Sequence, residues 1–106
     1  MTGKFEVRYT EAAREDLFRL FDFMLERAKT LDDFDAAQFA LDAIRAAVDE
    51  HLSKTPLIYR KAGDSPFLRE LIIPFRSAGY VALYEIVDRV IVNVVAVRHQ
   101  LEDDYY

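Results

Sequence analysis

The sequence contains no cysteine and only three glycines and three prolines among its 106 residues. Without cysteine the chain forms no disulfide framework, no cysteine-ligated zinc or iron–sulfur centre and no thiol nucleophile. Few glycines and prolines predict a small number of long elements joined by short connections. A chain of this length fits one compact domain, so we expect a single domain over residues 1–106.

Long hydrophobic runs are missing as well. The longest apolar stretch, residues 90–97, is interrupted by Asn93 and is far shorter than the ~20 residues of a membrane-spanning helix. The first residues lack the apolar core of a signal peptide. We therefore expect a cytoplasmic protein with no membrane partner.

The chain also lacks the motifs of cofactor, metal and hydrolase sites. Its two histidines, His51 and His99, do not have metal-site spacing. It has no glycine-rich phosphate loop and no serine-hydrolase elbow. We therefore expect no cofactor and no metal site.

The net charge of −5 is unevenly distributed. Residues 54–76 contain five basic and two acidic side chains, whereas the segments before and after them are acidic. An acidic chain argues against tight non-specific binding of nucleic acid, which needs several phosphate contacts. The basic segment is where an anionic group could bind, with an ordinary solvated surface as the alternative.

Hydrophobic periodicity predicts the order strand, helix, helix, strand, strand, strand. Residues 4–9 alternate as a strand, and Thr10 is predicted to cap a helix whose apolar face recurs from Ala13 to Ala28. A second helix follows, capped by Asp32, Asp33 or Asp35 and ended by Pro56. The three later strands are predicted at residues 67–75, 80–87 and 90–97, joined by a turn at 77–79 and a two-residue hairpin at 88–89.

This order predicts an α+β fold, in which an N-terminal strand and an antiparallel helical hairpin pack on one face of an antiparallel β-meander. The last strand is apolar on both sides, with Val92 and Val94 on one side and Val95 and Val97 on the other. Because the helices cover one face, we expect the other face to bind a partner or to be covered by the chain's own tail and loops.

Arg69 shares an apolar strand face with Phe67 and Leu71. A charge in that position is costly unless it is paired or faces an interface. One interpretation is an ion pair with an acid such as Glu85 on the next strand. The other is a guanidinium presented to a carboxylate or phosphate of a partner.

Several segments, in their order and spacing, resemble the RelE/ParE toxins, which are also called plasmid stabilisation proteins. They are residues 9–13, 16–17, 52–56, 67–71, 79–85 and 95–100, with Glu102 and Tyr105. The resemblance implies a RelE/ParE-like fold and a toxin of a type II toxin–antitoxin pair. Its partner would be a cognate antitoxin, with a homodimer or a heterotetramer with the antitoxin as possible assemblies.

Within this family, RelE-like members cut messenger RNA on the ribosome, whereas ParE-like members inhibit DNA gyrase. For an endoribonuclease, the resemblance implies a catalytic group of Arg60, Lys61, Arg69, Arg98 and Tyr105. The chain is acidic, however, and Leu101 stands where such relatives usually carry arginine, which would remove electrostatic stabilisation of the reacting phosphate. We therefore expect a ParE-like, non-enzymatic toxin that binds gyrase.

The alternatives are a ribosome-dependent messenger RNA endonuclease and an attenuated, non-toxic interaction module. For the surface that binds a partner, the apolar strand face and the resemblance together point to eight residues. We predict that they are Arg69, Arg76, Tyr80, Tyr84, Arg98, His99, Glu102 and Tyr105.

Overall fold

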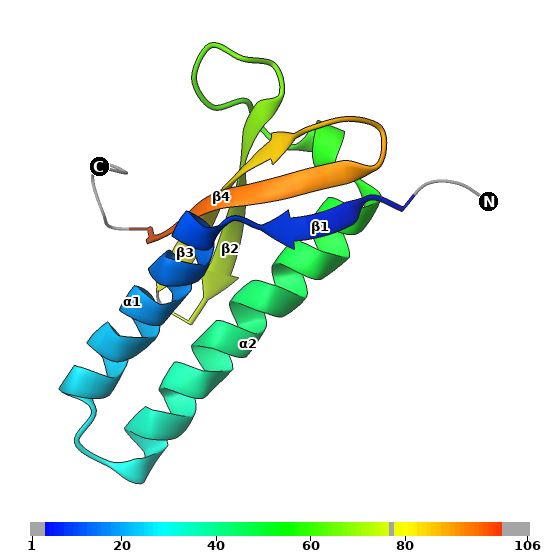
Figure 1. The fold of residues 1–106 in the computed structure, drawn as a ribbon. Helices are drawn as coiled ribbons and strands as arrows, with labels where there is room; N and C mark the ends of the chain where they lie inside the picture. Colours follow the sequence, from blue (N-terminus) through cyan, green and yellow to red (C-terminus); the bar gives the residue numbers. More distant parts are fainter. Residues whose placement is uncertain (1–3, 77, 101–106) are drawn as a thin grey trace.

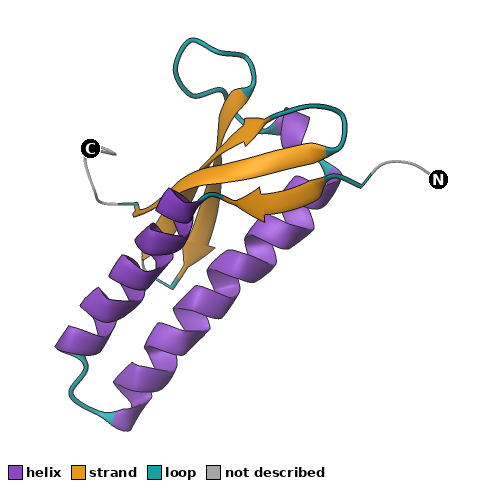
Figure 2. Ribbon diagram, viewed as in Figure 1, coloured by secondary structure: helices purple, strands orange, loops and turns teal. Residues whose placement is uncertain are grey.

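The computed structural model describes residues 4–76 and 78–100, and the predicted order of elements is confirmed. The elements are β1 (Glu6–Tyr9), α1 (Glu11–Arg27), α2 (Leu31–Lys54), the short 3-10 helix η1 (Pro56–Ile58), β2 (Leu68–Phe75), β3 (Ala78–Ile86) and β4 (Ile91–His99). Figure 2 shows the helices as an antiparallel pair beside the sheet. The fold is α+β, as predicted.

The sheet has four strands in the order β1-β4-β3-β2. β2, β3 and β4 pair antiparallel, which confirms the meander. β1 joins the outer side of β4 in parallel, over residues 6–9 against residues 91–94. The helical hairpin contacts the sheet at one end, and its connected end extends beyond the sheet (Figure 1).

Both long helices begin at a threonine. The Thr10 side chain accepts a hydrogen bond from the Ala13 amide at 3.1 Å, as predicted. The cap of α2 is Thr30 and not one of the three predicted aspartates. Asp33 occupies the third helical position instead, and its carboxylate accepts hydrogen bonds from the amides of Lys29 and Thr30 at 2.9 and 3.3 Å. This reciprocal capping box moves the helix start forward to Leu31.

The core lies between the helices and one face of the meander. Ala13, Ile44 and Val48 are fully buried on the helices, and Tyr84 and Val94 are fully buried on the strands. Ala13 lies on the helix face that the periodicity predicted to be apolar. Packing of this apolar layer therefore fixes which side of the sheet the helices cover.

A β-bulge at Val95 changes the faces of β4. The register steps from Leu83 opposite Ala96 to Tyr84 opposite Val94, so Val95 has no direct partner on β3. One extra residue reverses the alternation, and Val94 and Val97 consequently both reach the core. The prediction that these two valines lie on opposite faces was wrong.

The two hairpin connections also differ from the predictions. Phe75 pairs directly with Ala78, so β3 begins earlier than predicted, and Arg76, after the end of β2, adopts the left-handed conformation with φ of 56°. Gly79 is a strand residue, where a side chain would approach the Ile73 carbonyl oxygen within 2.7 Å. The β3–β4 connection spans residues 87–90 because the Asp88 side chain bonds two amides of a longer loop.

Candidate partner-binding surfaces

Arg69 binds backbone carbonyls of the segment that precedes β2. Its guanidinium donates hydrogen bonds to the carbonyl oxygens of Leu57 at 3.0 Å, Tyr59 at 2.7 Å and Pro66 at 3.1 Å. Arg69 lies opposite Tyr84 in the β2–β3 register, whereas Glu85 lies opposite Leu68. The ion pair with Glu85 is therefore absent, and Arg69 fastens the chain between α2 and β2 onto the sheet.

Tyr84 supports the same segment from inside the core. Its hydroxyl donates a hydrogen bond to the Pro56 carbonyl oxygen at 2.5 Å, and the side chain is fully buried. Burial raises the pKa of Tyr84 well above its ordinary value, and nearby Arg69 offsets part of that rise. Tyr80 is also buried, with its hydroxyl 3.7 Å from the Met24 sulfur. Both tyrosines, which the sequence predicted to bind a partner, belong to the core, and their part in partner binding stays a prediction.

Arg98 is held by Asp16 of α1. Arg98 Nη1 lies 2.9 Å from Asp16 Oδ2, and both side chains are largely buried. The same oxygen accepts a hydrogen bond from the Val97 amide at 2.9 Å. β1 ends at Tyr9, so the helical carboxylate satisfies a β4 amide that no longer has a neighbouring strand. We did not predict this role of Asp16, which sequence spacing alone does not reveal.

Of the basic residues predicted for a ribonuclease, Arg60, Lys61 and Arg69 lie close together, whereas Arg98 lies apart from them. Arg60 and Lys61 line a hollow of about 430 Å³, and Arg60 forms an ion pair with Glu70 at 2.8 Å. Lys61 bridges to Arg69 through the backbone. Arg98 is on β4, two strands away from Arg69 on β2. In the register of the sheet Arg98 aligns with Ile72, which is three residues beyond Arg69 along β2. That register places it about 10 Å across the strands and about 10 Å along them from Arg69.

The remaining predicted site residues have separate locations. His99 stacks edge-on against Tyr80, with ring centroids 5.5 Å apart. Arg76 is exposed in the β2–β3 turn, where its guanidinium lies 5.3 Å from the Phe75 ring centre. Leu101, Glu102 and Tyr105 lie outside the described residues.

The sheet face opposite the helices is less open than its sequence predicts. Val81 on β3 and Ala96 on β4 are buried there, and Leu83 is half-buried. Glu70 and Arg98 interrupt the apolar rows across the strands. Among the described residues of this face, Ile72 is the large apolar side chain that stays exposed. The expectation of a broad apolar face is therefore corrected to a mixed surface.

The larger apolar exposure lies on the helical hairpin. Phe18 and Phe23 of α1 and Phe34 and Phe39 of α2 are between 49% and 66% exposed. Leu31, at the start of α2, is exposed too. Four of them belong to the half of the hairpin that leads to the α1–α2 connection, and Phe18 lies at the middle of α1; we name the five residues the hairpin surface. Exposed aromatic side chains on one element mark it as a candidate protein-binding surface.

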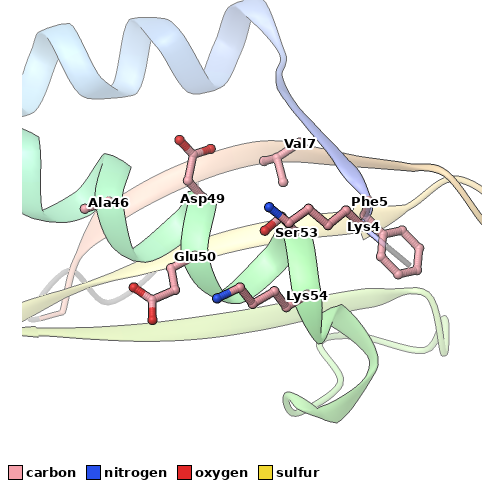
Figure 3. A pocket seen from close by; sticks show the side chains of 8 residues that line it. All are labelled: Lys4, Phe5, Val7, Ala46, Asp49, Glu50, Ser53 and Lys54. Carbon is pink, nitrogen blue, oxygen red and sulfur yellow. The ribbon is translucent and has the colours of Figure 1, made fainter. Parts of the chain in front are cut away.

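A hollow of about 590 Å³ lies between the start of β1 and the last turns of α2 (Figure 3). Its charged side chains are of both signs, with Lys4 and Lys54 beside Asp49 and Glu50. Because positive and negative side chains lie side by side, the electrostatic potential of the hollow has no single sign that would select a charged ligand. We assign it no function.

Within residues 4–76 and 78–100, acidic and histidine side chains nowhere gather in threes that could hold a metal ion. Neither helix of the described chain is long and apolar enough to cross a membrane.

The profile described as "ParE toxin of type II toxin-antitoxin system, parDE" matches residues 7–104. The chain belongs to the ParE toxin family. No curated protein matches it.

A solved structure supports the ParE fold independently. It is titled "Chromosomal ParDE TA system from P. aeruginosa" and superposes with a TM-score of 0.69 over 92% of this chain and 98% of that chain. The two sequences are 14% identical, so this likeness establishes the fold alone. The strand, helical hairpin and meander of this chain are thus those of a ParE-type protein.

Proposed function

We propose that this chain is a toxin that binds and inhibits DNA gyrase, and that a cognate antitoxin neutralises it by direct binding. The match of the ParE toxin family to residues 7–104 carries the proposal. The sequence favours the same function, because the chain is acidic and Leu101 stands where RelE-like relatives usually carry arginine.

The positions of the basic residues support a binding function over cleavage of RNA. Cleavage needs cations and a proton donor converging on one phosphate. Here Arg69 is bound to loop carbonyls, and Arg98 is paired with Asp16 at another part of the sheet. The guanidinium groups of Arg69 and Arg98 do not converge on one site. Their positions therefore favour a toxin that acts by binding its target over one that cleaves RNA.

We propose further that the antitoxin covers the hairpin surface. Its phenylalanines expose apolar area on a rigid pair of helices, which suits an amphipathic segment that folds as it binds. Arg27 lies over the Phe23 ring at 4.2 Å and adds a cation beside that apolar area. A partner with apolar and acidic side chains would complement both features.

Inducible expression in a bacterium tests the proposal. We expect growth arrest, a DNA-damage response and relaxed plasmid DNA, and co-expression of an adjacent small reading frame should restore growth. Arrest with normally supercoiled plasmid and fragmented messenger RNA would refute the gyrase target. Harmless expression of soluble, folded protein would refute toxicity.

A matched pair of variants tests the antitoxin surface. Phe23 and Phe67 are 52% and 54% exposed but lie at opposite ends of the molecule, so their replacement removes similar apolar area. Phe23→Ala should keep growth arrest and weaken rescue by the antitoxin, whereas Phe67→Ala should still be rescued. If both variants are rescued as well as the original chain, the antitoxin does not depend on the hairpin surface.

A further inference from the structure

A separate apolar surface lies at the end of the molecule opposite the hairpin surface. The start of β1, η1 and the β3–β4 connection meet at that end (Figure 1). Phe5, Leu57, Phe67 and Val87 line a hollow of about 410 Å³ there, together with Asp88 and Arg89. We name these six residues the end surface. None of them belongs to the predicted site, and the proposed function leaves them unused.

The apolar side chains of the end surface are exposed although their backbone is fixed. Leu57, Phe67 and Val87 are 55%, 54% and 48% exposed. The Leu57 carbonyl is bound by Arg69 at 3.0 Å, and the Phe67 carbonyl accepts the Ile86 amide at 2.9 Å. A surface whose backbone is already ordered loses little conformational entropy when it binds. These contacts therefore present a preorganised apolar patch.

The end surface carries one charge of each sign, on the adjacent residues Asp88 and Arg89. Asp88 uses its Oδ1 atom for the amides of Val90 and Ile91, at 2.7 and 2.9 Å, and remains an exposed anion. Arg89 is exposed and forms no ion pair with any described residue. Nearby Arg8 is engaged by Glu6 at 2.7 Å. Adjacent opposite charges let Asp88 of one copy meet Arg89 of another when the same patches face each other.

We propose that the end surface is an isologous interface between two copies of this chain. The apolar side chains around the hollow pack against their counterparts, and two Asp88–Arg89 pairs close the rim. A polar small molecule is a poorer occupant, because the lining offers few polar groups to orient it. This dimer would form from the isolated chain, whether or not the chain binds gyrase.

The exposed apolar area of the end surface limits the expected affinity of the dimer. Half-exposed apolar side chains contribute about 100 Å² each, so two copies bury an apolar centre well below the ~1,600 Å² of a standard interface. A dimer of this size should have a dissociation constant of about 10–100 µM. Association is therefore expected in concentrated solution and absent at high dilution.

Analytical ultracentrifugation of the purified chain tests the interface, over a range of about 5 to about 200 µM that brackets this constant. The weight-average mass should rise from that of a monomer toward that of a dimer. Phe67→Ala should raise the dissociation constant about tenfold or more, a loss of about 1.4 kcal/mol or more. Phe23→Ala should dimerise like the original chain. A monomer at every concentration overturns the proposal, and so does dimerisation that Phe67→Ala leaves unchanged.

A double-mutant cycle tests the charge pair. Asp88→Asn keeps an oxygen for the two loop amides and removes the charge, and Arg89→Gln removes the matching cation. Each substitution should raise the dissociation constant about threefold, and the double variant should be little worse than either, because both remove the same pair. Additive losses would show that the two side chains do not meet and would overturn the two-fold arrangement.

Discussion

Replacing Arg69 by alanine should destabilise the fold far more than it affects target binding. Three carbonyl oxygens, those of Leu57, Tyr59 and Pro66, lose their charged donor. A hydrogen bond to a charged group contributes about 1.5–3 kcal/mol, but these three share one half-buried side chain and do not add fully. We expect a loss of about 2–4 kcal/mol, which lowers the melting temperature of a domain this size by about 10–20 °C.

Thermal and urea denaturation followed by circular dichroism measure the loss. Arg60→Ala is the matched control, because Arg60 is 69% exposed and its ion pair with Glu70 should contribute about 0.5 kcal/mol or less. At a temperature where Arg69→Ala is still folded, its inhibition of gyrase should stay close to that of the original chain. Unchanged stability with abolished toxicity would show instead that Arg69 is presented to a partner.

Three further substitutions follow from described contacts. Asp16→Ala leaves the Val97 amide and a largely buried guanidinium without their acceptor, so unfolding should become easier by about 2–4 kcal/mol in urea titration. Tyr84→Phe orphans one buried carbonyl and should cost about 1–2 kcal/mol by the same assay. Two amides hold the pKa of Asp33 below its ordinary value of 3.8, so its stabilising effect is present at neutral pH and is lost as the pH falls below about 3.8. Asp33→Ala should therefore melt lower than the original chain at pH 7, with the gap closing in acid.

The helices and their inward faces could be predicted from the sequence, because the spacing of apolar residues and the capping residues determine them locally. Apolar residues at helical spacing identified Ala13 as a core position, and Thr10 was recognised as a cap from its place before an acidic turn. The bulge at Val95 was not predictable in this way, because residues 94–97 are apolar at every position and give no register signal.

The candidate site was harder to predict, since its partners are distant in sequence. Arg69 was identified as unusual, but the carbonyls that bind it belong to an irregular segment that carries no hydrophobic pattern. Asp16 is 82 positions from Arg98, and only the tertiary fold brings them together. The exposure of Phe23 and Phe67 was not predicted, because sequence shows hydrophobicity without showing which apolar residues the core leaves out.

The most direct measurement is a supercoiling assay with purified gyrase and this purified chain at micromolar concentration. The same protein is tested in parallel on messenger RNA in a translating extract. The account predicts that supercoiling is blocked while the transcripts remain intact. Gyrase that works normally in the presence of the folded protein would contradict it, most clearly if the transcripts were cut.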